Sequence, residues 1–272
     1  MITLAKLMRA GTNGGLAAID VRVLMRATLG VNDAYLIAHA DDEVSAQHAA
    51  QFRAAAARRA AGEPVAYIVG EREFYAHVFK VTPAVLIPRP ETELLVELAL
   101  QREPLQVLDL GTGSGCIAIS IALARPAARV SALDRAESAL AIARENAALL
   151  KARNVTFLSG NWFDAVTHQR FDVIVANPPY VAENDAHLAQ GDPRFEPASA
   201  LTAGIDGLAD IRVIVAGARA HLVPGGWMLF EHGYDQAKYC RELLMHAGFI
   251  DVQSWRDLAG IERVSGGRAP SL

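Results

Sequence analysis

The chain has 272 residues, of which 52% are hydrophobic and 21% charged, and its formal net charge is −4 at pH 7. This composition is far from that of disordered chains, and the length is sufficient for a core that needs no disulfide or metal. The acidic balance argues against a non-specific nucleic-acid binder, because such domains are usually basic.

The cysteines and histidines limit which cellular compartment and which metal sites are plausible. The only two cysteines, Cys116 and Cys240, exclude a disulfide framework and a cysteine-rich zinc site, and the 8 histidines show no metal-ligand spacing. The N-terminus lacks the apolar segment of a secretory signal, and the longest uncharged stretch, 110–124, is too short to span a membrane. We therefore expect a soluble, cytoplasmic protein without a metal site.

The first part of the chain, residues 1–64, predicts a small helical bundle. Apolar residues recur at helical spacing, Asp20 is a candidate N-cap, and Gly30 is a candidate helix end. A long helix is expected over 45–61, ending at Gly62. No strand is expected in this domain.

Residues 65–84 have a different texture and predict a β-hairpin linker. The segments VAYIVG and EFYAHVFKV are rich in aromatic and β-branched residues. The following segment, TPAVLIPRPETE, has too many prolines for a helix interior or a central strand. It is either ordinary connecting chain or a wall of a substrate site, and it ends where Glu91 and Glu93 enter a helix introduced by Arg89-Pro90.

Residues 85–272 predict a doubly wound α/β domain with a mostly parallel sheet. Short apolar strands alternate with amphipathic helices, which is typical of a sheet that is covered on both faces. The expected strands are 106–110, 128–134, 155–160, 171–177, 227–233 and 249–255, and the expected helices are 116–124, 136–150, 209–221 and 236–246.

A glycine loop follows the first of these strands. In VLDLGTGSG the loop Gly111-Thr112-Gly113-Ser114-Gly115 opens a helix, so backbone N–H groups and a partial positive charge face a ligand. The spacing is neither that of a P-loop nor that of a dinucleotide site. Asp134 ends the next strand, where an acidic residue binds ribose hydroxyls, although it is also a candidate helix cap. An adenosine ligand without a pyrophosphate, such as S-adenosylmethionine, agrees best with this pattern.

The segment Asn177-Pro178-Pro179-Tyr180 carries the second motif. It follows a strand at the edge of the sheet where α/β domains place ligands. A planar NH2 group that donates to the Asn177 side-chain oxygen and the Pro178 carbonyl would be held by both hydrogens, and Tyr180 can stack on it. Its nitrogen lone pair would then point out of plane toward an electrophile.

Together these motifs resemble the HemK/PrmC family of peptide chain release factor N5-glutamine methyltransferases. Further similar segments are LIPRPETE, FEPASALTAGIDGL and FEHGYDQ. The resemblance implies a seven-stranded S-adenosylmethionine-dependent methyltransferase (Rossmann-like) fold. It also implies an N-terminal domain that docks the substrate, a glutamine in the Gly-Gly-Gln loop of class 1 release factors.

The resemblance assigns roles by position. Residues Gly111 to Gly115 would contact the methionine part of the cofactor, Asp134 its ribose, and Trp162 its adenine, although such a tryptophan is also a candidate core residue. Asn177 would lie near cofactor and substrate and act in catalysis with Pro178 and Tyr180. The substrate site would comprise Asn177, Pro178, Pro179, Tyr180, Phe74, Arg89 and Glu91, with Arg89 alternatively paired to a carboxylate.

The expected reaction is an in-line displacement by the amide nitrogen, which leaves S-adenosyl-L-homocysteine. We expect a monomer that acts on a protein, without membrane or direct nucleic-acid binding. One alternative is a glutamine methyltransferase that acts on a ribosomal protein. Others are an adenine-specific DNA methyltransferase, which the acidic charge and the lack of a target-recognition domain disfavour, and a docking factor that retains only the fold.

Overall fold

A computed structural model describes residues 2–271, which divide into two compact units. The first unit comprises Met1–Glu71 together with Ala189–Phe195, and the second comprises Arg72–Leu188 and Glu196–Leu272. The division therefore falls inside the segment expected as a linker, and the first unit also includes a short segment far along the chain.

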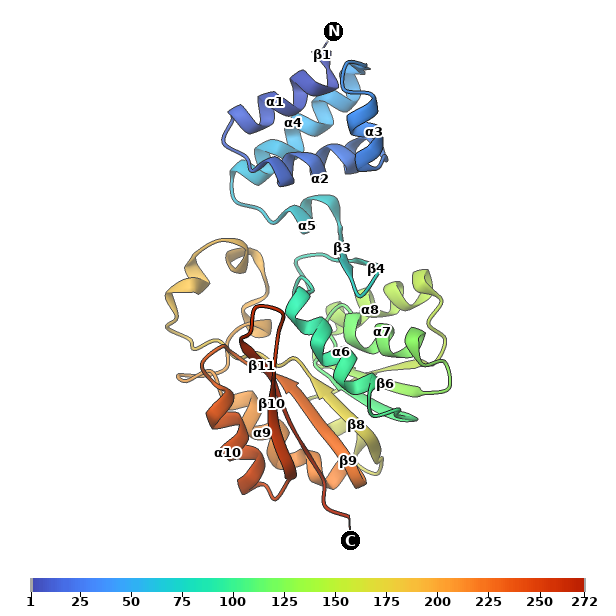
Figure 1. The fold of residues 1–272 in the computed structure, drawn as a ribbon, viewed down its shortest axis with the longest axis vertical. Helices are drawn as coiled ribbons and strands as arrows, with labels where there is room; N and C mark the ends of the chain where they lie inside the picture. Colours follow the sequence, from blue (N-terminus) through green and yellow to red (C-terminus); the bar gives the residue numbers. More distant parts are fainter. Residues whose placement is uncertain (1, 272) are drawn as a thin grey trace. The chain divides into compact units, whose positions relative to one another are not determined.

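The first unit is a small bundle built on α1, α2 and α4 (Figure 1). Its core consists of side chains from these helices that are nearly inaccessible to solvent, including Leu7, Leu24, Met25 and Phe52. The elements are β1 (Ile2–Thr3), α1 (Leu4–Asn13), α2 (Ala18–Leu29), α3 (Asp33–Ala38), β2 (Glu43–Val44), α4 (Ala46–Ala60) and α5 (Val65–Val69).

Three details of this unit differ from the expectation. Asp20 does not cap α2 but lies in its first turn, where its carboxylate accepts a hydrogen bond from Arg59 Nε at 2.7 Å. Two-residue strands β1 and β2 pair antiparallel, and strands this short show no alternation that a sequence could reveal. Residues 65–69 form helix α5 rather than a strand, and Gly70 ends it in the left-handed conformation.

The expected hairpin is formed by β3 (Glu71–Phe74) and β4 (His77–Lys80), and all of it except Glu71 belongs to the second unit. Tyr75 and Ala76 at its turn both have positive φ, as a tight two-residue hairpin turn requires. Pro90 then begins the short 3-10 helix η1 (Pro90–Thr92), which leads into α6 (Glu93–Leu100) as predicted.

The centre of the second unit is a seven-stranded sheet in the order β10-β11-β9-β8-β5-β6-β7, which confirms the predicted fold. Among these seven strands, β11 alone runs opposite to the other six. The sequence had not located β11, because its Ser-Gly-Gly stretch lacks strand propensity. The remaining strands are β5 (Gln106–Leu110), β6 (Arg129–Asp134), β7 (Val155–Ser159), β8 (Phe171–Ala176), β9 (Leu222–Glu231), β10 (Ile250–Arg256) and β11 (Glu262–Arg268).

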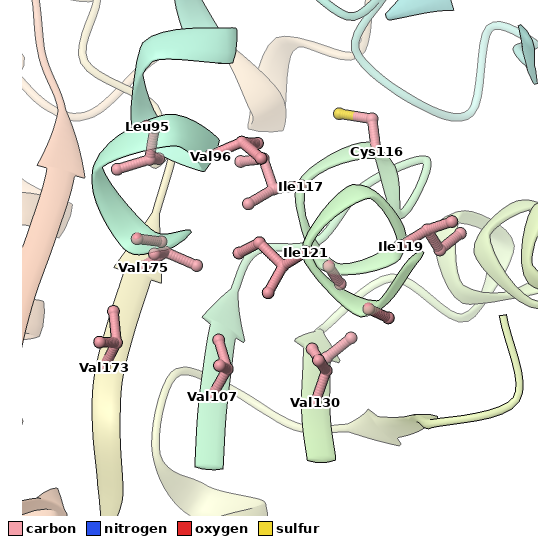
Figure 2. Packing of buried hydrophobic residues seen from close by; sticks show 14 of the residues in the cluster. Leu95, Val96, Val107, Cys116, Ile117, Ile119, Ile121, Val130, Val173 and Val175 are labelled. Carbon is pink, nitrogen blue, oxygen red and sulfur yellow. The ribbon is translucent and has the colours of Figure 1, made fainter. Parts of the chain in front are cut away.

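Helices cover both faces of this sheet (Figure 1). On one face lie α6, α7 (Cys116–Ala124) and α8 (Glu137–Leu150), and on the other lie α9 (Ala209–Ala218) and α10 (Ala237–His246). Figure 2 shows the first layer, in which apolar side chains of α6 and α7 pack onto Val107, Val130, Val173 and Val175 of three strands. Successive residues of β8 alternate between the two layers, with Val173 and Val175 in one and Ile174 in the other.

The register of the central strands brings the two motifs together. Leu110 at the end of β5 pairs with Leu133 of β6 on one side and with Ala176 of β8 on the other. Since all three strands are parallel, the residues that follow them emerge at the same sheet edge. The glycine loop, Asp134 and Asn177 are therefore neighbours.

Candidate active site

A cavity lies at the carboxyl ends of β5, β6 and β8, with an empty volume of about 980 Å³ including its opening to solvent. Its walls are formed by the glycine loop, by the ends of the three strands, by six residues between Ala84 and Thr92, and by Pro197, Ser199 and Ala200. Every one of these lining residues belongs to the second unit.

The glycine loop forms the floor of the cavity at the start of α7. Gly111 and Gly113 both line the cavity and have φ values of 72° and 56°, which an L side chain rarely adopts. A Cβ at Gly113 would have no heavy atom nearer than Gly111 O at 4.0 Å, so this side of the backbone is open. A ligand can therefore approach the loop backbone directly.

Gly115, the last glycine of the loop, packs against neighbouring side chains. It does not line the cavity, and a Cβ there would lie 2.8 Å from Ile119 Cδ1 and 3.2 Å from Ala143 Cβ. This glycine permits close packing of α7 against α8, whereas Gly111, Thr112, Gly113 and Ser114 face the cavity.

Asp109 and Thr112 anchor the loop from below. Thr112 Oγ1 donates to Asp109 Oδ2 at 2.6 Å, and both side chains are buried. Burial raises the pKa of Asp109 to about 7. This contact ties the loop to the end of β5.

Asp134 joins the glycine loop to the next helix. Its Oδ2 accepts from Gly113 N–H and its Oδ1 from Ala136 N–H, both at 2.9 Å. The carboxylate lines the cavity and retains lone pairs for further donors. It is not the N-cap of α8, since that position belongs to Ala136.

Trp162 is the aromatic wall beside this loop. It lines the cavity, and a Cβ placed on Gly111 would lie 3.6 Å from Trp162 Cζ3. Its φ of 49° is uncommon for a non-glycine residue. The ring also packs against the core under α9, so it lies between that core and the cavity.

Asn177 is the polar side chain that the second motif brings to the cavity. Its Nδ2 donates to Thr92 Oγ1 at 3.2 Å. Pro179 also lines the cavity, whereas Pro178 is buried and Tyr180 faces inward. Tyr180 Oη donates to Glu231 Oε1 at 3.0 Å, and burial together with this carboxylate raises the pKa of Tyr180.

Of the three further residues predicted for the substrate site, the structure brings only one to the cavity. Arg89 lines the cavity wall and is ion-paired with Glu196, which bears out the alternative of a carboxylate partner. Phe74 is 1% exposed and packs against Phe79 in the core, and Glu91 is exposed outside the cavity lining. The sequence does not reveal which of these three side chains faces the cavity, which faces the core and which faces solvent.

The structure adds residues that the motifs did not reveal. Thr92 and Asp210 line the cavity, and Glu231 lies buried behind Thr92. Burial raises the pKa values of both carboxyls. Glu231 lies in the FEHG segment that contributed to the resemblance. The sequence therefore marked this segment, but it did not indicate that Glu231 binds Thr92.

Residues 2–271 contain no group of three or more His, Cys, Asp or Glu side chains arranged to hold a metal ion. Within the same range no helix combines the length and apolar character needed to cross a bilayer. The polar groups that line the cavity are carboxyls, side-chain amides, hydroxyls, guanidinium groups and backbone N–H groups.

Comparison with known proteins identifies the family. The chain is 54% identical to the release factor glutamine methyltransferase of Bordetella pertussis, over 93% of this chain and 95% of that protein. It is 42% identical to the protein of the same name from Escherichia coli, over 92% and 91%. The chain belongs to the release factor glutamine methyltransferase family.

Family models agree with this membership along most of the chain. The PrmC N-terminal domain matches residues 5–70, and the Methyltransferase small domain matches residues 90–201. The resemblance to the HemK/PrmC family is therefore confirmed, and the protein is a methyltransferase.

Solved structures support the fold of this family member. A methyltransferase from Pyrococcus furiosus superposes with a TM-score of 0.58 and 19% identity, over 79% of this chain and 98% of that chain. The 16S rRNA N2 G1207 methyltransferase RsmC from T. thermophilus has a TM-score of 0.55 and 23% identity, over 73% and 49%. At these identities the likeness shows the methyltransferase fold alone.

Proposed function

We propose that this protein methylates the side-chain amide nitrogen of the glutamine in the Gly-Gly-Gln loop of class 1 release factors, with S-adenosylmethionine as donor. The observation that carries the proposal is Asn177, whose amide group stands at the cavity edge with its Nδ2 already bound to Thr92. Its oxygen is therefore left to accept from a planar NH2 group. The names of the relatives support the release factor as the substrate.

The cavity residues agree with the chemistry of the cofactor. The open backbone at Gly113 and the nearby start of α7 suit a small zwitterionic group. The Asp134 carboxylate suits ribose hydroxyls and Trp162 suits an adenine ring. S-adenosylmethionine supplies an electrophilic methyl group on a positively charged sulfur.

The protein residues in this proposal position the amide rather than deprotonate it. As the amide nitrogen bonds to the methyl carbon, the carbon–sulfur bond breaks and one amide proton becomes acidic and is released. No strong base is needed before attack, so orientation supplies most of the rate. The Asn177 oxygen and the Pro178 carbonyl accept from the amide and stabilise the positive charge that develops on its nitrogen.

The first unit, with its helical bundle, is the proposed docking domain for the release factor. Large apolar side chains on it are exposed, with Ile37 at 80% and Ile19 at 58%. Such side chains suit contact with a protein better than contact with a phosphate backbone. We further propose that the protein is a monomer in the cytoplasm. Its two buried free cysteines agree with a reducing compartment.

Transfer of a labelled methyl group tests the proposal. Purified protein and labelled S-adenosylmethionine are incubated with a release factor, with the same factor carrying Gln→Ala in its Gly-Gly-Gln loop, with ribosomal proteins and with duplex DNA. We expect label in the unaltered release factor alone. Label in a ribosomal protein or in DNA instead, or label that persists in the Gln→Ala factor, would overturn the proposed substrate.

A further inference from the structure

Behind the cavity, Glu231 binds Tyr180 of the second motif and Thr92, which in turn binds Asn177 of the same motif. It ends β9, is 1% exposed, and accepts from Thr92 Oγ1 at 2.6 Å through Oε2 and from Tyr180 Oη at 3.0 Å through Oε1. Thr92 is itself 2% exposed and ends η1. One buried carboxylate thus connects two elements that are distant in sequence.

Counting protons along this chain fixes the direction of each hydrogen bond. A threonine hydroxyl has one hydrogen, and an ionised Glu231 can only accept, so Thr92 donates to Glu231. Thr92 Oγ1 must then accept from its other neighbour, Asn177 Nδ2 at 3.2 Å. The oxygen and nitrogen of an amide are assigned from such partners. Only one of the two orientations of the Asn177 amide satisfies Thr92, and it leaves Oδ1 for the substrate.

If Glu231 were protonated, the direction of each of these hydrogen bonds could reverse, and the consequence shows why its charge matters. If Glu231 donated, Thr92 would accept from it and donate its own hydrogen to Asn177. The Asn177 oxygen would then face Thr92, and its NH2 group would face the cavity. Two NH2 groups cannot hydrogen-bond through their donors alone, so this state would not hold a glutamine amide.

Other groups around Glu231 bias its charge in both directions. Burial raises the pKa of Glu231, Glu91 on η1 raises it further, and Arg263 on β11 lowers it. Cys116 at the start of α7 also faces this region, and burial raises the pKa of its thiol to about 12, so it stays neutral. The two hydroxyl donors and Arg263 oppose this rise, and both hydroxyls can donate to Glu231 at once when it is ionised.

We propose that Glu231 and Thr92 are positioning residues of the methyl transfer. The Glu231 carboxylate, acting through the Thr92 hydroxyl, turns the Asn177 amide so that its oxygen faces the substrate, and it holds Tyr180 at the same time. The inference rests on the proposed function, since it describes how the amide acceptor of that reaction is oriented. Neither residue contributes a reacting atom.

A pair of substitutions at Thr92 tests this role. Thr92→Val removes the hydroxyl at nearly constant volume, and we expect kcat to fall by about 10- to 100-fold, as misorientation of a reacting group does. Cofactor affinity should change by less than about threefold, because the glycine loop and Asp134 are untouched. Thr92→Ser retains the hydroxyl and should restore most of the loss. The same Thr→Val change at Thr156, an exposed position on β7, is the matched control.

A double substitution separates positioning from general damage. Glu231→Leu, which removes both acceptor oxygens, should by itself lower kcat. Adding Thr92→Val should lower it little further, because both changes break one chain of hydrogen bonds. The proposal would be overturned if the fold-losses in kcat of the two single variants multiplied in the double variant. It would also be overturned if kcat of Thr92→Val stayed within about threefold of the wild type. Unfolding midpoints identify any variant that is simply unstable.

Nuclear magnetic resonance of the Asn177 side chain keeps this test independent of the substrate. With ¹⁵N-labelled asparagine, the Asn177 NH2 signals should show a hydrogen-bonded proton in the wild type and in Thr92→Ser. That feature should be absent in Thr92→Val. Unaltered signals in Thr92→Val would overturn the positioning role. A wild type that transfers no methyl to the release factor, yet shows the expected signals, would overturn only the proposed function.

Discussion

Arg89 and Glu196, 107 positions apart in the sequence, form an ion pair in the wall of the cavity. The Glu196 side chain is completely inaccessible to solvent, and its Oε1 also accepts from Ile87 N–H at 3.0 Å. One carboxylate thus fastens the proline-rich segment before η1 to the loop that follows the second motif. This contact is why a segment without regular structure can form a stable wall.

Removal of this carboxylate should destabilise the protein. We expect Glu196→Ala to lower the free energy of unfolding by about 2–4 kcal/mol, because it leaves a half-buried guanidinium and a buried N–H without this acceptor. Glu196→Gln, which retains an acceptor for Ile87, should cost less. Urea denaturation measures both. The control is Glu145→Ala, which breaks an exposed pair with Lys80 and should cost at most about 1 kcal/mol. Equal costs for the buried and the exposed pair would contradict the argument.

Two glycines of the same loop should respond differently to alanine. Gly113→Ala places a methyl group toward the cavity at a φ of 56°, so cofactor affinity should fall more than about tenfold for a stability cost of roughly 1–2 kcal/mol. Gly115→Ala pushes its Cβ against Ile119 and Ala143 and should cost more stability. Its folded fraction should still bind the cofactor. Titration calorimetry and denaturant unfolding measure the two effects. The reverse pattern would mean that the cofactor does not lie over Gly113.

Glu231 should give activity and stability opposite dependences on pH. Burial raises its pKa above the ordinary value of 4.5, so between the two values the folded state holds a proton that the unfolded chain releases. The contribution to unfolding free energy is therefore lost as pH rises through this interval. Activity should rise over the same interval, because the ionised carboxylate orients Thr92 and Asn177. Measurements of kcat and of urea midpoints from pH 5 to 8 check both slopes, and Glu231→Gln should flatten both.

Asn177 should affect the rate of methyl transfer far more than it affects cofactor binding. We expect Asn177→Ala to lower kcat by about 10²- to 10³-fold, because the substrate amide loses an acceptor aligned with its NH2 group. Cofactor affinity measured by calorimetry should remain within about fivefold, since Asp134 and the glycine loop persist. A kcat near that of the wild type would remove Asn177 from the mechanism.

Docking through the first unit should appear in KM rather than in kcat. Ile37 is 80% exposed, so Ile37→Asp should hardly change stability but should raise KM for the release factor several-fold. Leu258→Asp, at a fully exposed position in the second unit, is the matched control. Steady-state methylation kinetics distinguish the two variants. Equal KM values for both would place docking elsewhere.

The strands, most helices and both motifs were predictable because their signals are local. A strand that runs into Gly111 and another that runs into Asn177 are visible in short stretches of sequence, and parallel strands of one sheet deliver their carboxyl ends to the same edge. Predictions were wrong where local composition was ambiguous. Residues 65–69 are apolar and β-branched, yet they form helix α5, whose buried Tyr67 shows that packing overrides strand propensity.

By itself the sequence determined the fold, the family and four of the five loop residues that line the cavity, because these depend on patterns that span only a few residues. Only the tertiary structure decided that Arg89 pairs with Glu196, that Phe74 lies in the core, and that Glu231 stands behind Thr92. The two hydrogen-bonded pairs join residues 107 and 139 positions apart, and no local pattern specifies which buried donors and acceptors will meet. The acidic composition argues only against nucleic-acid binding, whereas the tertiary structure shows which donors the carboxylates of Glu196 and Glu231 bind.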